Sequence, residues 1–147
     1  MKKIKVFVSQ PMNGLTREEI QKVRPTALER VSKYLIEEKC LTDFTLVPIN
    51  DIISGVSFEE ECRLDELGLD PNNPPRTWWL GKDIQEMGAA DMFVFCPRYY
   101  EAEECMIERQ VCRYYFGDVP TVLLTDVDII CQGYLSTLIA KLKETDD

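Results

Sequence analysis

Glu108 is the acidic residue whose surroundings in the sequence most strongly indicate chemistry. If its segment is helical, the side chains on the same face are mostly apolar: Cys105, Val111, Cys112 and Tyr115. A carboxylate among apolar side chains lowers stability unless it is paired or has a function. Glu108 is therefore either a functional carboxylate or a glutamate on the helix flank, which reaches solvent or pairs with an arginine such as Arg24.

Asp83 is the second acid of interest. It lies in a predicted helix beside the crevice in which the sheet predicted below is expected to bind its ligand. It either faces that crevice together with Glu108 or is a first-turn acid that interacts favourably with the helix dipole. The acids at the expected start of the helix that carries Glu108 are interpreted as solvated residues: Glu101, Glu103 and Glu104.

Other side chains have the chemistry to bind a ligand. Gln10 and Asn13 carry both donors and acceptors, as recognition of a nucleobase edge requires, although Pro-Met-Asn-Gly is also a good turn sequence. Arg98 and Arg76 are the side chains to which tighter binding of a 5′-monophosphate than of its nucleoside would point as a phosphate clamp. Four aromatic residues either stack on a base or pack within the protein: Trp78, Trp79, Tyr99 and Tyr100.

The composition excludes several classes of function. The chain contains no histidine, which excludes Ser-His-Asp and Cys-His catalysis and His-based metal sites. None of the six cysteines forms a C-x-x-C pair, which indicates reduced thiols in a cytoplasmic protein and argues against zinc. The net charge of −9 disfavours nucleic acids and anionic lipid and favours a small neutral or cationic ligand, or another protein. No apolar run approaches the roughly 20 residues of a membrane span, and the start has no signal-peptide pattern.

Apolar runs and turn signals predict alternating strands and helices. The predicted strands are residues 4–8, 44–49, 91–96 and 119–124, with a short edge strand at 128–131. The predicted helices are residues 16–38, with a kink or a break at Pro25, and residues 58–67, 78–87, 103–116 and 134–143. The acidic stretch 50–77 contains no clear strand and is either a lid over the crevice or a mobile loop without a function.

This alternation predicts one α/β domain over residues 1–147, with three layers and a flavodoxin-like or Rossmann-like topology. Its parallel sheet has four to five strands in the order 2-1-3-4. Ligands of such sheets bind beyond the carboxyl ends of the strands, so the loops 10–13 and 97–101 border one pocket with Asp83 and Glu108. The residues expected to bind the substrate are Gln10, Pro11, Met12, Asn13, Arg98 and Tyr99.

Three segments resemble the nucleoside 2-deoxyribosyltransferase-like superfamily, and most closely its short bacterial and phage members. They are the opening strand and loop Val6–Gly14, the run Asp83–Asp91, and Glu108 at the position of the family's nucleophile. The family often has Ser-x-Gly-x-x-x-Glu, whereas this chain has Ala102 and Glu104 in place of the serine and glycine. The added negative charge disfavours a 5′-phosphate and affects unphosphorylated nucleosides less; loss of activity is the other reading of this change.

The resemblance implies cleavage or transfer at the N-glycosidic bond of a (deoxy)nucleoside. Glu108 would attack C1′ of the sugar, Asp83 would hold or protonate the departing base, and Gln10 and Asn13 would bind the base edge. It further implies a homo-oligomer that needs no metal or organic cofactor. The alternative is a non-catalytic protein that binds a nucleoside or nucleotide in the same pocket. The base, the sugar and the choice between transfer and hydrolysis are left open.

Overall fold

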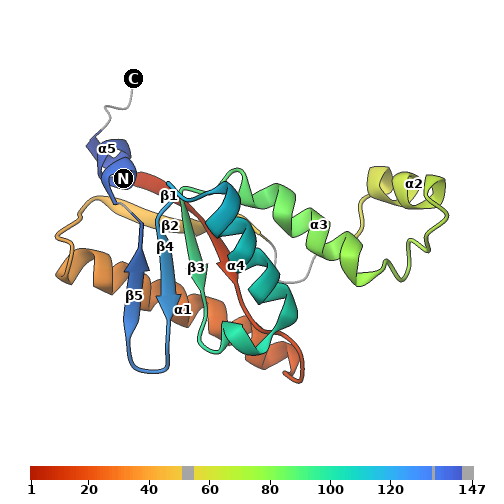
Figure 1. Ribbon diagram of the computed structural model, residues 1–147, viewed down its shortest axis with the longest axis horizontal. Helices are drawn as coiled ribbons and strands as arrows, with labels where there is room; N and C mark the ends of the chain where they lie inside the picture. Colours follow the sequence, from red (N-terminus) through yellow and green to blue (C-terminus); the bar gives the residue numbers. More distant parts are fainter. Residues whose placement is uncertain (51–54, 134, 144–147) are drawn as a thin grey trace.

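A computed structural model of the chain describes residues 1–50, 55–133 and 135–143. Its centre is a five-stranded sheet in the order β2-β1-β3-β4-β5 (Figure 1). The strands are β1 (Lys2–Ser9), β2 (Phe44–Pro48), β3 (Met92–Phe95), β4 (Thr121–Leu124) and β5 (Ile129–Gln132). The first four strands run parallel and β5 pairs antiparallel with β4. The predicted α/β class and strand order are confirmed. The fifth strand forms an edge of the sheet and runs antiparallel to its neighbour.

Helices cover both faces of the sheet and complete the predicted three layers (Figure 1). On one face, side chains of α1 (Arg17–Glu37) and α5 (Ser136–Lys143) pack against Val6, Val8 and Val94. On the other face, α3 (Arg76–Met87) and α4 (Glu103–Tyr115) pack against an aromatic layer that contains Phe7 and Phe93. Alternate residues of β1 and β3 thus point into two separate cores, which explains why β3 and the segment Val6–Val8 of β1 are apolar without alternation.

The first helix shows how packing overrides a local signal. Thr16 and Glu19 form the expected capping box at its start. The helix then continues through Pro25 as one element, so the predicted alternative of a break into two helices is wrong. Beyond the proline, buried Ala27, Val31 and Leu35 fix the helix on the sheet. This packing outweighs the backbone hydrogen bond that proline cannot make.

The acidic stretch 50–77 contains one complete helix and the start of a second. The first is α2 (Phe58–Glu66), which begins with a capping box at Ser57 and is tied to α3 by a Lys82–Glu60 ion pair of 3.3 Å. The second, α3, begins at Arg76 directly after Pro75, two residues earlier than predicted. Asp83 consequently lies in the second half of α3, so its interpretation as a first-turn acid is wrong.

The end of α4 leaves aromatic side chains in solvent. Tyr114 and Tyr115 are 80% and 79% exposed, and so do not pack beneath the last helix. Phe116 turns inward, with its ring centroid 5.5 Å from that of Phe93. Within the described ranges, no helix combines the length and the apolar character needed to cross a membrane.

Candidate functional site

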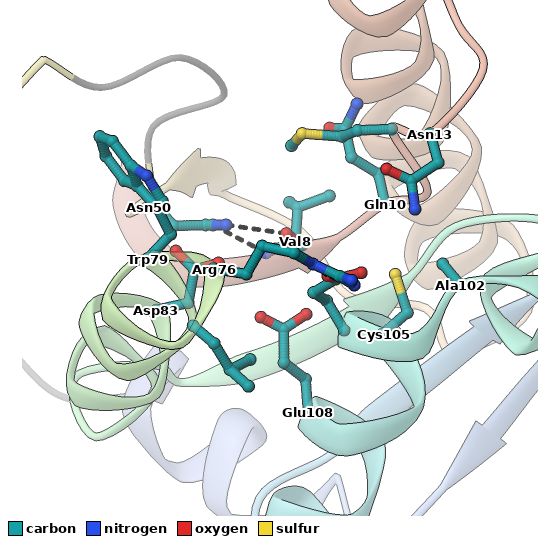
Figure 2. A pocket seen from close by; sticks show the side chains of 13 residues that line it. Val8, Gln10, Asn13, Asn50, Arg76, Trp79, Asp83, Ala102, Cys105 and Glu108 are labelled. Atoms are coloured by element: carbon teal, nitrogen blue, oxygen red, sulfur yellow. Dashed lines mark hydrogen bonds and ion pairs between the residues drawn. The ribbon is translucent and has the colours of Figure 1, made fainter. Parts of the chain in front are cut away.

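A pocket of about 300 Å³ opens beyond the carboxyl end of β1, between α3 and α4 (Figure 2). This is the edge at which ligands bind in parallel α/β sheets. Its described lining residues come from four segments: Val8, Gln10, Met12 and Asn13; Asn50; Arg76, Trp79, Leu80 and Asp83; and Ala102, Glu104, Cys105 and Glu108. We call this the acidic pocket, after Asp83, Glu104 and Glu108.

Glu108 lies on the buried face of α4 and is only 4% exposed, so the interpretation of a glutamate that reaches solvent is wrong. Ser9, the last residue of β1, donates a hydrogen bond of 2.7 Å from its Oγ to Glu108 Oε1. The alternative partner Arg24 is directed elsewhere, since its guanidinium donates to Gln10 Oε1 at 3.1 Å and to the Asn50 carbonyl. The Glu108 carboxyl thus faces the pocket with a hydroxyl donor beside it.

Asp83 and Glu108 point into the pocket from opposite helices (Figure 2) and interact directly. Burial is the main reason why the pKa of Glu108 rises to about 8, and the nearby Asp83 charge adds to the rise. Burial also raises the pKa of Asp83, while a hydrogen bond with Glu108 and the Arg24 and Lys82 charges oppose that rise. Two carboxyls in this relationship share one proton, which the pair holds more tightly than separate carboxyls in water would.

The end of β1 is held by Asn50, which the sequence reading did not single out. Its side-chain Oδ1 accepts from the Val8 N–H at 2.9 Å and its Nδ2 donates to the Val8 carbonyl at 2.8 Å. This buried amide pairs with the backbone as a neighbouring strand would, and so fixes the segment that carries Ser9. Its signal in the sequence is its place just after the second predicted strand, at the same sheet edge.

Gln10 lines the pocket but is also engaged with α1. Its Nε2 donates to the Ile20 carbonyl at 2.9 Å, and its Oε1 accepts from Arg24. These bonds fix the loop after β1 on the helix and leave Gln10 one free amide hydrogen and one oxygen lone pair. Met12 and Asn13 from the same loop also line the pocket, as expected.

Arg76 reaches from the start of α3 across the mouth of the pocket towards α4 (Figure 2). It pairs with Glu104 and, at 3.3 Å, with Glu103. Glu104 is the main cause of the raised pKa of Arg76, and Arg76 in turn lowers the pKa of Glu104. The acids at the start of α4 are therefore not simply solvated, because two of them bind the cation at the pocket mouth.

Three of the expected substrate-binding residues are not among the described lining of the acidic pocket: Pro11, Arg98 and Tyr99. Arg98 adopts a left-handed backbone conformation (φ 66°) and lies 3.8 Å from Asp126. Tyr99 begins the short turn η1 (Tyr99–Glu101), and its ring packs against Phe95. Of the expected lid 50–77, Asn50 and Arg76 line the acidic pocket and residues 55–75 do not, while residues 51–54 lie outside the described residues.

The site contains carboxylates, amides and a hydroxyl, and this set determines its possible chemistry. In the described part of the chain, no group of three or more Cys, Asp or Glu side chains is arranged to hold a metal ion. All six cysteines are free, and burial raises the pKa of the pocket residue Cys105 to about 12, so this thiol is a poor nucleophile. The described lining groups that can act as acids or bases are therefore the carboxyls of Asp83, Glu104 and Glu108.

Comparison with known proteins found no match among family models, curated proteins or solved structures. The resemblance to the nucleoside 2-deoxyribosyltransferase-like superfamily, and the roles that it implies, stay predictions.

Proposed function

We propose that this protein cleaves or transfers the N-glycosidic bond of a (deoxy)nucleoside, with Glu108 as the nucleophile. The observation that carries the proposal is the pair formed by the half-buried Asp83 and the buried Glu108, whose carboxyls face one pocket from two helices and share a proton. Two carboxyls in unlike protonation states are what glycosidic chemistry requires, one as nucleophile or base and the other as acid.

The shared proton supports a specific order of events. When the proton passes from Glu108 to Asp83, Glu108 becomes a carboxylate and Asp83 becomes an acid. The Glu108 oxygen forms a bond to C1′ of the sugar while the bond from C1′ to the base nitrogen breaks, and Asp83 donates the proton to the departing base. Water, or a second base, then displaces Glu108 from C1′ and returns a proton to the pair. Ser9 holds one Glu108 oxygen in place throughout.

The rest of the lining suits a ligand of nucleoside size. A volume of about 300 Å³ is at the lower end of the usual range for small-molecule sites. Trp79 offers an aromatic surface on which a base can stack, and its ring is itself held edge-on by Trp78 at 4.7 Å. Asn13, together with the amide hydrogen and the oxygen lone pair of Gln10 that remain unused, is available to hydrogen-bond the edge of the base. Arg98 and Tyr99 have no place in this proposal.

A non-catalytic nucleoside-binding protein is the second candidate, and one observation favours it. With a pKa of about 8, Glu108 is mostly protonated at neutral pH and is then no nucleophile. The helix that carries it also starts at Ala102 without a side-chain cap, where the family often has serine. In this alternative the neutral carboxyl donates a hydrogen bond to the ligand, and no bond is broken.

The two candidates are separated by incubation with a panel of nucleosides and free bases, followed by chromatography. The enzyme releases or exchanges a base, and the Glu108→Gln protein does not. A binding protein shows saturable binding by calorimetry with all nucleoside recovered intact. If the protein shows no turnover and no binding with any member of the panel, both proposals are ruled out.

The reaction as proposed involves only side chains of this chain and needs no cofactor. The free state of all six cysteines supports a reducing compartment, so we place the reaction in the cytoplasm. The partner we propose is the nucleoside or base itself, because the chain's net charge of −9 opposes binding of nucleic acid.

A further inference from the structure

A second cavity, of about 250 Å³, lies at the opposite edge of the sheet. It is bounded by the last turns of α4, the first residue of β4 and the last residue of β5. Its described lining residues are Arg109, Cys112, Arg113, Phe116, Gly117, Val119, Thr121, Gln132 and Gly133. We call it the arginine pocket. Its described lining contains no carboxylate, although the chain has 26 acidic residues.

Two arginines four positions apart on α4 give this pocket its charge. Residues at this spacing are neighbours on a helix surface, and like charges there repel one another. Arg109 is held in place, because it donates to Gln132 Oε1 and its guanidinium carbon lies 5.9 Å from the centre of the Phe95 ring. Arg113 is exposed, and within the described chain no side chain pairs with it. No acidic side chain of the described lining therefore offsets the repulsion between them.

Neutral donors stand beside the two guanidinium groups. Thr121 lines the pocket with its side chain buried, and its Oγ makes only a long contact of 3.4 Å with the Val119 carbonyl. Gln132 accepts from Arg109 through its oxygen, which leaves its amide nitrogen as a donor. Positive charge and hydrogen-bond donors thus converge in this pocket. The planar guanidinium group of arginine can donate two hydrogen bonds to the oxygens of one phosphate.

We propose that the arginine pocket binds a small phosphate anion, either inorganic phosphate or a phosphomonoester. Arg109 and Arg113 would hold its oxygens, and Thr121 and Gln132 would donate to those that remain. A cavity of about 250 Å³ suits a single phosphate group with a small substituent and is tight for a dinucleotide. The site is independent of the chemistry proposed for the acidic pocket.

The test is calorimetric titration of the full chain with inorganic phosphate, pyrophosphate and a nucleoside 5′-monophosphate at low ionic strength. Arg113→Gln is the main variant, because an exposed side chain without a partner can be changed without loss of fold. Arg17→Gln is the matched control, since it removes the same charge from an exposed arginine at the start of α1. Arg76→Gln reports on phosphate bound at the acidic pocket instead.

We expect phosphate to bind the wild-type and Arg17→Gln proteins equally and to bind Arg113→Gln about tenfold more weakly, the size of one lost charged hydrogen bond. Added salt should weaken binding to the wild type. Amide signals of Thr121, Gln132 and Gly133 should shift in a parallel NMR titration. The proposal is overturned by no phosphate binding, by equal loss in Arg17→Gln, or by a loss found only in Arg76→Gln. Tighter binding of the monophosphate than of inorganic phosphate would identify an ester as the ligand, and the reverse would identify the free anion.

Discussion

The two halves of α4 carry opposite charges in opposite surroundings. In its first half, Glu104 and the buried Glu108 line the acidic pocket at the carboxyl edge of the sheet. In its second half, Arg109 and Arg113 line the arginine pocket at the other edge. A helix dipole favours acids in the first turn and bases in the last, which accounts for Glu104 and Arg113. It does not account for Glu108 or Arg109, which lie in the middle.

The two halves of α4 differ in which groups lie beside each charged side chain. Glu104 has a cation in Arg76, and its pKa falls. Among the described residues, Glu108 is hydrogen-bonded by the Ser9 hydroxyl and lies beside the Asp83 carboxyl, and burial is the main reason why its pKa rises to about 8. A buried acid without a cation must hold a proton, whereas an arginine keeps its charge at any ordinary pH. The acidic pocket can therefore change its charge near neutral pH, and the arginine pocket cannot.

The largest expected effect comes from replacing the carboxyl that distinguishes the acidic pocket. Glu108→Gln should reduce any nucleoside turnover by at least about 10³-fold, because an amide is a far weaker nucleophile of nearly the same shape. Circular dichroism should show an intact fold, and phosphate binding at the arginine pocket should be unchanged. Full activity in this variant would remove the covalent mechanism.

The second effect is a fall in stability with rising pH. A carboxyl whose pKa is raised from 4.5 to about 8 on folding binds its proton more tightly in the native state. The contribution of Glu108 to the free energy of unfolding should therefore be fully present below pH 4.5. It should be lost as the pH rises from 4.5 to about 8. The loss should be on the order of a few kcal/mol, measured by urea unfolding across this range.

The control for this prediction is Glu108→Gln, which has no proton to lose at this position. Its stability should change less than that of the wild type between pH 4.5 and 8. Identical dependence of stability on pH in the two proteins would show that Glu108 titrates normally. The two halves of α4 would then differ only in the sign of their charge.

A smaller effect concerns phosphate at the acidic pocket. Nucleosides should bind there about tenfold more tightly than their 5′-monophosphates, because Asp83 and Glu104 repel the added charge and Arg76 is already paired. Calorimetry with the Arg113→Gln protein isolates this pocket from the other. Tighter binding of the monophosphate would contradict the prediction, and its loss in Arg76→Gln would identify that arginine as a phosphate clamp.

The smallest effect is expected on assembly. We expect a homo-oligomer, and the outer face of α4 between the two pockets offers exposed Ile107 and Tyr114 as a contact surface. Light scattering at micromolar concentration should give a mass above that of one chain. Tyr114→Ser should weaken assembly a few-fold, whereas Phe58→Ser, at an equally exposed position on α2, should not. A single-chain mass for the wild type would rule the oligomer out.

The sequence by itself determined the sheet and the place of the nucleophile candidate. An apolar run without alternation indicated that β3 is covered on both faces, and helical spacing placed Glu108 beside two cysteines that prove to be buried. The order 2-1-3-4 was expected of a flavodoxin-like or Rossmann-like sheet, and it is the order of the first four strands. Asp83 and Glu108 were assigned to one pocket because ligands of such sheets bind beyond the carboxyl ends of the strands.

Only the tertiary structure decided what those acids contact. Ser9 and Glu108 are 99 positions apart in the chain, and Asn50 is 42 positions from Val8, so no local pattern could pair them. Arg98 follows the predicted third strand, but its side chain lies beside Asp126 and is not among the described lining of the acidic pocket. The pKa of Glu108 likewise depends on burial against residues from other elements. Periodicity fixes which face a side chain occupies, whereas its partners and its proton depend on the packing of distant segments.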